Sequence, residues 1–346
     1  MNYPLREEDV FAIHLVQDQQ KDMFLDSLEQ LGIPFRPSWR QAKLRPQDTN
    51  VFVVNVNEKC MEYRSQPFIC AAMASNGVRF YSAQEFCRLA ELGFPKNTRR
   101  PFFHVPHDGN RFPEELMKSV CVSREAFFAY HAAMRDVGVR DLIPEEYRGA
   151  GNCECFPVSR LLCDVERFVG PEEVMERYGM GFCYERAYDG TKIKQVTEKL
   201  RSRTLRYYSR HHDRMDALCE KSRRLVLFDL HSYHDEIVPR ELLKDTPTPD
   251  VCIGTDTHFT PPVLVQLVRD HLEAAGFSTA VNDPYAGTFV PNAVMQSRTD
   301  CDLISIMLEF HKRVYCDAQL VPNPEKQMRI QQLLRPIVAD IIASVA

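Results

Sequence analysis

Two histidines stand directly after short apolar runs, and carboxylates accompany both of them. His107 lies in a Pro-His-Asp-Gly turn after the apolar residues 102–105, and His231 follows the apolar run 225–228. Asp229 precedes His231 by two residues, so the two share one side of an extended segment. Imidazole nitrogens and carboxylate oxygens are common ligands of catalytic zinc. If both runs are strands of one sheet, these residues predict a catalytic site with about one Zn²⁺ per chain.

Glu309 is a further candidate, because it lies inside the otherwise apolar run 305–310. A carboxylate in such a run is costly unless it is paired or protonated, and burial raises its pKa. A general base works best when its pKa is close to the working pH. The run therefore predicts a general base at Glu309. The alternative is an ordinary charge that points outward from an edge strand.

The elements that must position these residues follow from the apolar patterning. Short apolar runs predict strands at 51–57, 102–105, 159–165, 224–230 and 305–310. Longer stretches with helical spacing predict helices at 124–138, 204–221, 261–277 and 323–346. This alternation predicts an α/β fold with a mainly parallel or mixed central sheet flanked by helices. In such sheets sites gather where strands end, which is where both histidines stand.

The chain of 346 residues is long enough for two domains. Residues 1–95 carry few groups that could do chemistry, and we expect them to form an N-terminal extension or a small α/β subdomain. Residues 96–346 are expected to form the catalytic domain. A turn-rich stretch at 93–101 is expected to link the two parts.

Composition narrows the class of protein. Hydrophobic residues make up 44% and charged residues 26%, as in ordinary globular proteins. The net charge of −5 gives no reason to expect nucleic acid or a membrane surface as partner. The start of the chain lacks a basic segment followed by a long apolar run, and no stretch is apolar over a bilayer-spanning length. The simplest interpretation is a cytoplasmic enzyme with a small-molecule substrate.

The 12 cysteines are scattered along the chain, and no Cys-x-x-Cys pair occurs. The close pair Cys153 and Cys155 lacks a second pair at zinc-ribbon spacing. We expect reduced thiols that fill small apolar sites. A redox or thiol-dependent protein is an alternative interpretation, but no cysteine stands in a recognisable nucleophile context.

Five segments, in this order, resemble the N-formylglutamate amidohydrolase family. They are FFHVPHDGNRFPEEL, SRLLCDVERF, RYYSRHHDRMDAL, LVLFDLHSYHDEIVP and IMLEFHKRVY, and they leave the N-terminal quarter of the chain unmatched. They are also similar to the zinc carboxypeptidase (phosphorylase/hydrolase-like) fold, where an Asp-x-His-Ser-Tyr strand end supplies a zinc ligand. The resemblance implies zinc-dependent hydrolysis of a linear amide in an N-formyl or N-acyl amino acid, such as N-formylglutamate.

The resemblance implies a metal site formed by His107, Asp136 and His231. His107 and His231 match the two histidine ligands. The carboxypeptidases place a glutamate three residues after the first histidine, where this chain has Asn110. Asp136 matches an aspartate of the amidohydrolase family and is therefore the preferred third ligand, although it could also be a solvated carboxylate at a helix end. The alternatives for the third ligand are Glu114, Glu115 and Asp164.

The same resemblance implies the roles of further residues. Glu309 matches the general base, and Arg167 matches an arginine that holds a substrate carboxylate through paired hydrogen bonds. Arg160 is a second candidate for that contact. His212 matches a histidine on a helix that faces the site, where it supports the site or stabilises the transition state. The family's asparagine before the arginine is Glu166 here, which puts strict glutamate specificity in question.

Two more interpretations stay open. A carboxypeptidase-like peptidase or another amide hydrolase would use the same site with a larger pocket. A catalytically degenerate member would bind or regulate, with the N-terminal region as its working part. We expect Asp229 to orient a ligand, and His104 and His234 to be structural or rim residues. The patterns leave the exact substrate and the oligomeric state undetermined.

Overall fold

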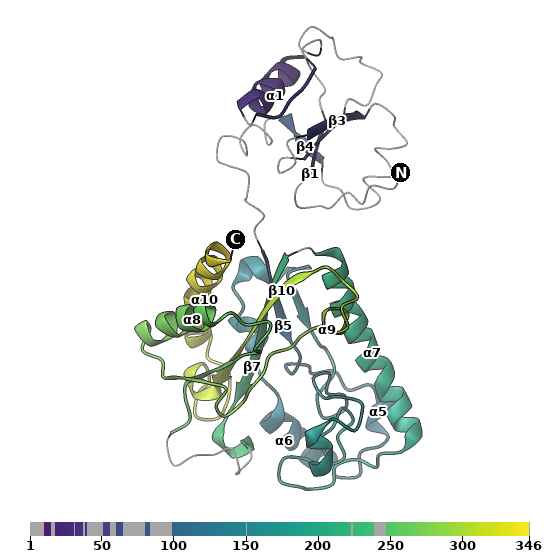
Figure 1. Cartoon of the computed structure of the whole chain (residues 1–346). Helices are drawn as coiled ribbons and strands as arrows, with labels where there is room; N and C mark the ends of the chain where they lie inside the picture. Colours follow the sequence, from purple (N-terminus) through teal and green to yellow (C-terminus); the bar gives the residue numbers. More distant parts are fainter. Residues whose placement is uncertain are drawn as a thin grey trace. The chain divides into compact units, whose positions relative to one another are not determined.

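A computed structural model describes most of the chain after residue 98 and parts of the region before it. The described residues are 10–14, 18–30, 32–36, 39, 51–55, 60–64, 80–83, 99–149, 151–222, 224–238 and 247–345. The chain divides into two compact units, Met1–Thr98 and Arg99–Ala346 (Figure 1). The expected linker at 93–101 falls largely outside the described residues, and its last two residues already belong to a strand.

The N-terminal unit is a small α/β layer. Its elements are β1 (Val10–His14), α1 (Asp18–Gln30), β2 (Val51–Asn55), β3 (Cys60–Arg64) and β4 (Phe80–Ser82). The strand order is β3-β2-β1-β4, with only the β1–β4 pair parallel. Ile13, Phe24, Leu28 and Phe52 form its buried core. The strand expected at 51–57 is β2, and residues 56 and 57 lie outside the described residues.

The second unit is built on a six-stranded mixed sheet in the order β6-β5-β7-β10-β8-β9. Its strands are β5 (Arg100–Val105), β6 (Cys153–Cys155), β7 (Arg224–Tyr233), β8 (Val251–Gly254), β9 (Thr279–Val281) and β10 (Asp302–His311). Every neighbouring pair is parallel except β10 with β8. The expected fold class, a mainly parallel or mixed sheet flanked by helices, is confirmed.

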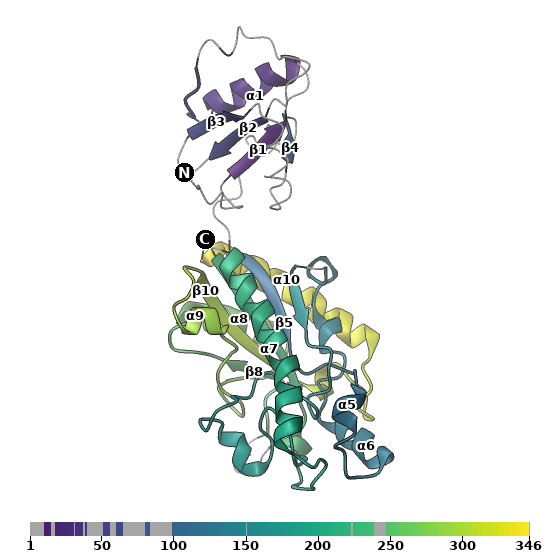
Figure 2. The same cartoon turned by 90° about the vertical axis from the view of Figure 1, so that its right-hand side faces the viewer.

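Helices cover both faces of this sheet. The α-helices are α5 (Glu114–Met117), α6 (Arg124–Met134), α7 (Glu198–Lys221), α8 (Pro262–Ala274), α9 (Asn292–Met295) and α10 (Pro324–Ser344). Short 3₁₀ helices are η1 (Val139–Leu142), η2 (Glu145–Tyr147), η3 (Val174–Tyr178), η4 (Asp235–Ile237) and η6 (Lys312–Val314). Helices α8 and α10 lie on one face and α7 on the other (Figures 1 and 2). Among the described helices, none is long and apolar enough to cross a membrane.

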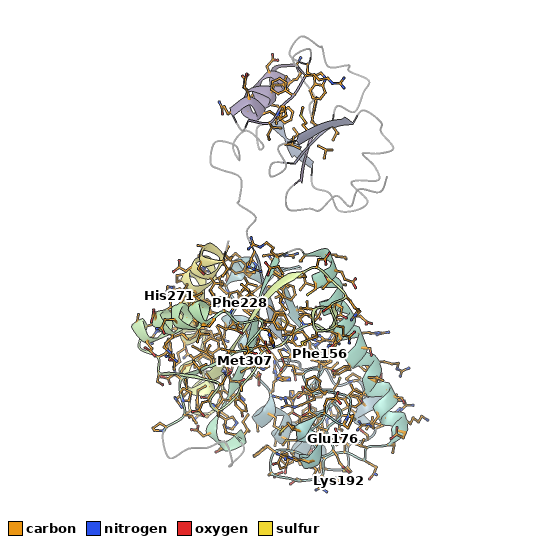
Figure 3. The ribbon with its side chains drawn as sticks, viewed as in Figure 1. Phe156, Glu176, Lys192, Phe228, His271 and Met307 are labelled. Carbon is orange, nitrogen blue, oxygen red and sulfur yellow. The ribbon has the colours of Figure 1, made fainter. Side chains whose placement is uncertain are left out.

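The central strands are apolar along their length because both of their faces are covered. In β7, Val226, Phe228 and Leu230 pack into the core beneath α8 and α10. Leu225 and Leu227 alternate with them and pack on the opposite face, with Met215 of α7. Figure 3 shows the side chains of this unit filling the layers on both sides of the sheet.

Strand alternation and register then decide where the polar residues lie. Asp229 and His231 have the same parity as Leu227, so they lie on the α7 face. In β10, Glu309 has the same parity as Leu303, which packs in that same cluster. The parallel register places Glu309 directly beside His231. Two candidate catalytic residues are therefore neighbours on one face, at the end of two buried strands.

The prediction of a strand at 159–165 is wrong, because this segment forms turns. The amide groups of Leu162 and Cys163 both donate to the Ser159 carbonyl, which closes a tight turn. Leu161, Leu162 and Cys163 are fully buried in a second apolar cluster. The apolar run thus reflects the burial of a loop, and β6 takes the place beside β5 instead.

The helix predicted at 124–138 also ends early, at Met134, because Arg135 is extended. Gly138 follows in the left-handed region with φ 75, and residues 135–138 form the connection to η1. Helix α7 begins earlier than predicted, at Glu198, where Thr197 caps it. The other two predicted helices correspond to α8 and α10.

Gly109 offers a test of the turn that follows β5. A Cβ atom there would lie 2.3 Å from the Val158 carbonyl oxygen and 2.7 Å from that of Phe156. We expect Gly109→Ala to lower the free energy of unfolding by ~1–3 kcal/mol, the usual cost of overpacking. Urea unfolding measures this. Gly149→Ala is the control, since nothing lies within 4 Å of that Cβ position. An equal effect in both variants would contradict the close approach.

Candidate active site

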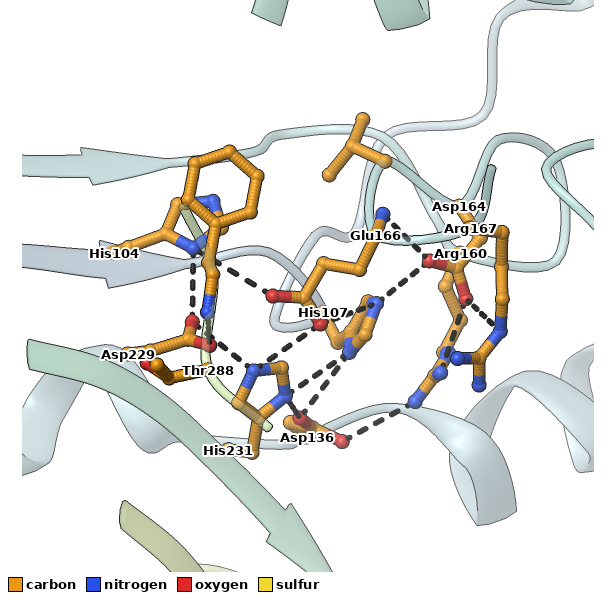
Figure 4. Close-up of polar contacts among 12 residues, drawn as sticks. His104, His107, Asp136, Arg160, Asp164, Glu166, Arg167, Asp229, His231 and Thr288 are labelled. Carbon is orange, nitrogen blue, oxygen red and sulfur yellow. Dashed lines mark hydrogen bonds and ion pairs between the residues drawn. The ribbon is translucent and has the colours of Figure 1, made fainter. Parts of the chain in front are cut away.

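Three potential metal ligands converge at the carboxyl ends of β5 and β7. The Nδ1 atoms of His107 and His231 are 3.2 Å apart. Asp136 Oδ2 lies 3.7 Å from His107 Nδ1 and 3.3 Å from His231 Nδ1 (Figure 4). All three side chains are buried. Neither carboxylate oxygen of Asp136 has a hydrogen-bond partner among the described residues. Two imidazole nitrogens facing a carboxylate without partners form a donor set that fits a divalent metal ion.

Carboxylates hold the other nitrogen of each histidine. His107 Nε2 lies 2.9 Å from Asp164 Oδ1, and His231 Nε2 lies 3.1 Å from Asp229 Oδ1. An Nε2–H group that donates to a carboxylate leaves the Nδ1 lone pair free to face the cluster. Asp229 therefore lies where it can orient His231, as expected from the sequence. Asp164 has the same relation to His107 and does not lie between the two Nδ1 atoms.

The charge state of Asp136 suits a ligand. Burial acts to raise the pKa of Asp136, but the adjacent His107 and His231 outweigh it and hold the pKa well below its usual range. The carboxylate is therefore ionised. Its exposure of 1% excludes the alternative of a solvated carboxylate at a helix end.

Backbone contacts hold Asp136 in place after α6. The Asp136 amide donates to the His107 carbonyl at 3.2 Å. The next residue along the chain from His107, Asp108, accepts hydrogen bonds from the amides of Gly138 and Arg140, each at 3.1 Å. The turn that carries the first histidine thus also binds the segment that carries the aspartate.

Lys312 strengthens this arrangement from the end of β10. Its fully buried ammonium group donates to the carbonyls of Ala133 at 3.0 Å and Arg135 at 2.7 Å. A buried lysine needs such partners, because an unpaired buried charge is costly. Sequence reasoning missed this residue. Its position directly after the strand that carries Glu309 was the one available signal.

Glu309 lies at the wall of a cavity of about 390 Å³ beside the cluster. Its side chain is 7% exposed. Burial raises the pKa of Glu309 to about 7, although the neighbouring His231 acts to lower it. A carboxyl group with such a pKa exchanges protons near neutral pH.

The two arginines differ in how they are bound. Arg160 Nη2 is 3.0 Å from Asp164 Oδ2, and Arg160 Nη1 is 3.7 Å from Asp136 Oδ1. Arg167 pairs more weakly, with its Nε 4.0 Å from Asp164 Oδ2. The Nε atoms of both arginines have no hydrogen-bond partner in the described part of the chain, and both arginines line the cavity, so the difference lies in these carboxylate contacts. Arg160 is thus bound to protein carboxylates, whereas Arg167 is available to a ligand.

Glu166 points toward the histidines, away from Arg167 (Figure 4). Its Oε2 is 3.2 Å from His231 Nε2 and 3.7 Å from His107 Nε2. With His104 and Asp229 it forms a second group close enough to surround a cation. In that group, however, Asp229 Oδ1 already lies 2.9 Å from His104 Nδ1. The group at His107 and His231 has the carboxylate without partners and is the stronger candidate.

The family model for N-formylglutamate amidohydrolase matches residues 101–316. The chain belongs to the N-formylglutamate amidohydrolase family. This membership confirms the resemblance read from the sequence and supports an amide hydrolase.

Two solved structures share the fold of this chain. A crystal structure of N-formylglutamate amidohydrolase from Ralstonia eutropha JMP134 matches with a TM-score of 0.56 at 20% identity, over 73% of this chain and 97% of that one. The crystal structure of gene product Atu2144 from Agrobacterium tumefaciens matches with a TM-score of 0.51 at 16% identity, over 72% and 94%. At this identity they show the shared fold alone. No curated protein matches the chain.

The remaining ligand candidates of this N-formylglutamate amidohydrolase family member lie elsewhere. Glu114 pairs with Lys118 on the exposed side of α5, and Glu115 accepts a hydrogen bond from Tyr207. Asn110, at the position where the carboxypeptidases have a glutamate, lies 3.1 Å from a nitrogen of His131. Of the carboxylates considered as a third ligand, the structure therefore places Asp136 between the two histidines.

Three other histidines considered from the sequence lie around these ligands. His212 donates from Nε2 to the Val165 carbonyl at 2.9 Å and lines the cavity from α7. Burial lowers the pKa of His212, so it is neutral near pH 7. His104 is fully buried and lies 2.9 Å from His211, so it is structural and does not lie at the rim. His234 bonds to the Ala133 carbonyl.

Sequence reasoning also missed the aromatic residues of the cavity. Tyr184, Tyr208, Tyr285 and Phe289 line it, and they come from loops and from α7. Tyr184 donates to Asp164 Oδ2 at 2.9 Å, so it helps to hold the carboxylate behind His107. No spacing rule predicts them, because loops bring them together from distant parts of the chain.

The metal site has a direct test. We expect His107→Ala and His231→Ala to lose most of the zinc that the purified wild-type protein holds, because each removes one of few ligands. Metal content per chain, measured by mass spectrometry after dialysis, is the readout. His271→Ala is the control, since that residue lies on α8 and bonds to Asp340 (Figure 3). Full occupancy in both cluster variants would exclude the site.

Proposed function

We propose that this protein is a zinc-dependent amidohydrolase that cleaves the amide bond of an N-formyl or N-acyl amino acid with a free carboxylate. One observation carries the proposal. The Nδ1 atoms of His107 and His231 face the carboxylate of Asp136, which has no hydrogen-bond partner among the described residues, and Glu309 lies beside His231 in the neighbouring strand. Metal ligands next to a buried acid that titrates near neutrality favour an enzyme over a degenerate binding protein.

His107, Asp136 and His231 would hold the zinc ion. When bound, zinc supplies Lewis acidity, which polarises a carbonyl and makes water a better nucleophile at neutral pH. Asp164 and Asp229 contribute by fixing the orientation of the two imidazole rings.

Glu309 acts as the general base. It takes a proton from the attacking water and delivers it to the nitrogen of the leaving amine, so that the amide breaks into a carboxylic acid and an amine. For an N-formyl substrate the acid is formate. Glu309 lines the cavity in which the water and the leaving group of a bound substrate would lie.

Arg167 binds the carboxylate of the substrate, because its guanidinium lines the cavity and has only a weak protein partner. Binding at this distance from the reacting bond aligns the amide for attack. Arg160 lies beside Asp136 and gives positive charge to the region where the carbonyl oxygen becomes negative. His212 positions the segment that carries Arg167, through the Val165 carbonyl.

The cytoplasmic location remains a prediction from composition.

Glu309→Gln tests the base. The amide has almost the same shape but accepts no proton, so we expect kcat to fall by roughly a hundredfold or more. Zinc content and unfolding temperature should match the wild-type protein. Turnover on an N-formyl amino acid, by release of formate, measures the effect. Near-normal turnover with zinc bound would assign the role to another group.

Arg167→Met tests the carboxylate contact. We expect kcat/KM for N-formyl amino acids to fall by a factor that corresponds to ~2 kcal/mol or more, because a charge-assisted bond is lost. The matching carboxamide substrates should lose little, since they carry no carboxylate. A fall of equal size for acids and amides would show that Arg167 acts on the fold of the site.

A further inference from the structure

Beyond the proposed metal site, the charged residues that line the cavity leave it with little positive charge for a ligand. Among the described lining residues the arginines are Arg160 and Arg167. Arg160 is already bound to Asp164 and Asp136, whereas Arg167 has only the long contact with Asp164. His212 is neutral and donates to a backbone carbonyl. The described part of the cavity thus offers one guanidinium to a substrate carboxylate.

Glu166 adds negative charge to the same cavity. Its carboxylate lies beside His107 and His231 and has no arginine or lysine partner among the described residues. Glu166 and Arg167 are adjacent in sequence, yet the Arg167 side chain turns toward Asp164, whereas Glu166 contacts Asp164 through its backbone amide (Figure 4). A ligand that spans the cavity therefore meets a cation at Arg167 and an anion at Glu166.

Methionine and aromatic side chains form part of the remaining wall. They include Phe168, Met175, Met180, Tyr208, Tyr285 and Met307. Phe168 is 58% exposed and Tyr188 36%, so both offer apolar surface that a ligand could cover. Phe168 follows Arg167 directly, so this surface begins beside the proposed carboxylate contact.

We propose that the substrates are N-acyl amino acids with one carboxylate and an apolar side chain, and that the site selects against dicarboxylates such as N-formylglutamate. This rests on the proposed amidohydrolase function. Arg167 takes the single carboxylate, and the methionines and aromatic residues take the side chain. Away from the proposed metal site, a second carboxylate would lose part of its hydration without a described cation to receive it, and Glu166 would repel it.

Three N-formyl amino acids of similar length test this selection: the norleucine, glutamine and glutamate derivatives. We expect kcat/KM to fall in that order, with at least a tenfold difference between norleucine and glutamate. Calorimetric titration of the Glu309→Gln variant should show Kd rising in that same order. Glutamate as the best substrate would overturn the selection and leave the amidohydrolase function intact. No cleavage of any of the three by zinc-loaded protein would overturn both.

Glu166→Gln isolates the contribution of the charge. The measured quantity is the ratio of kcat/KM for the glutamate derivative to that for the glutamine derivative, which cancels any change in zinc affinity or folding. We expect this ratio to rise at least tenfold. Glu172→Gln is the control, because it removes an exposed charge that does not line the cavity. An unchanged ratio in Glu166→Gln, or an equal rise in the control, would overturn the role of Glu166.

Discussion

The buried carboxylate of Asp136 is the constraint on which the site depends. An ionised carboxylate without hydrogen-bond partners is among the most costly groups to bury, so it needs nearby positive charge. His107 and His231 lie within 3.7 Å of it, and Arg160 lies behind it at 3.7 Å. The arrangement is stable only when a cation or a protonated imidazole balances the carboxylate. This is why a metal ion suits the position so well.

Contacts from the surrounding structure hold these groups in place. Asp108 binds the backbone after α6, and Lys312 binds its carbonyls from the other side. Asp229 and Asp164 fix the rings of the two histidines. These contacts connect β5, β7, β10 and α6, so the position of each site residue depends on several elements at once. Preorganisation of this kind is what hydrolysis of a stable amide requires.

Family membership supports amide hydrolysis, whereas the substrate is a proposal that depends on the cavity. The proposed ligands, base and anchoring cation lie around His231, Glu309 and Arg167. In that proposal the choice of substrate side chain depends on other residues, chiefly Glu166 and the apolar side chains of the wall. A carboxylate at position 166 would change the electric field inside the cavity without replacing a proposed ligand.

The sequence alone pointed to His107, His231 and Glu309 as candidate site residues, because each follows or interrupts an apolar run whose strand character is local; their roles stay predictions. It also predicted the layered α/β fold from the spacing of those runs. It could not distinguish a buried loop from a strand at 159–165, since both are apolar. The burial of Asp136 between the two histidines, the direction of Glu166 and the aromatic wall depended on contacts between distant segments. Local sequence patterns do not specify such contacts, so only the tertiary structure decided them.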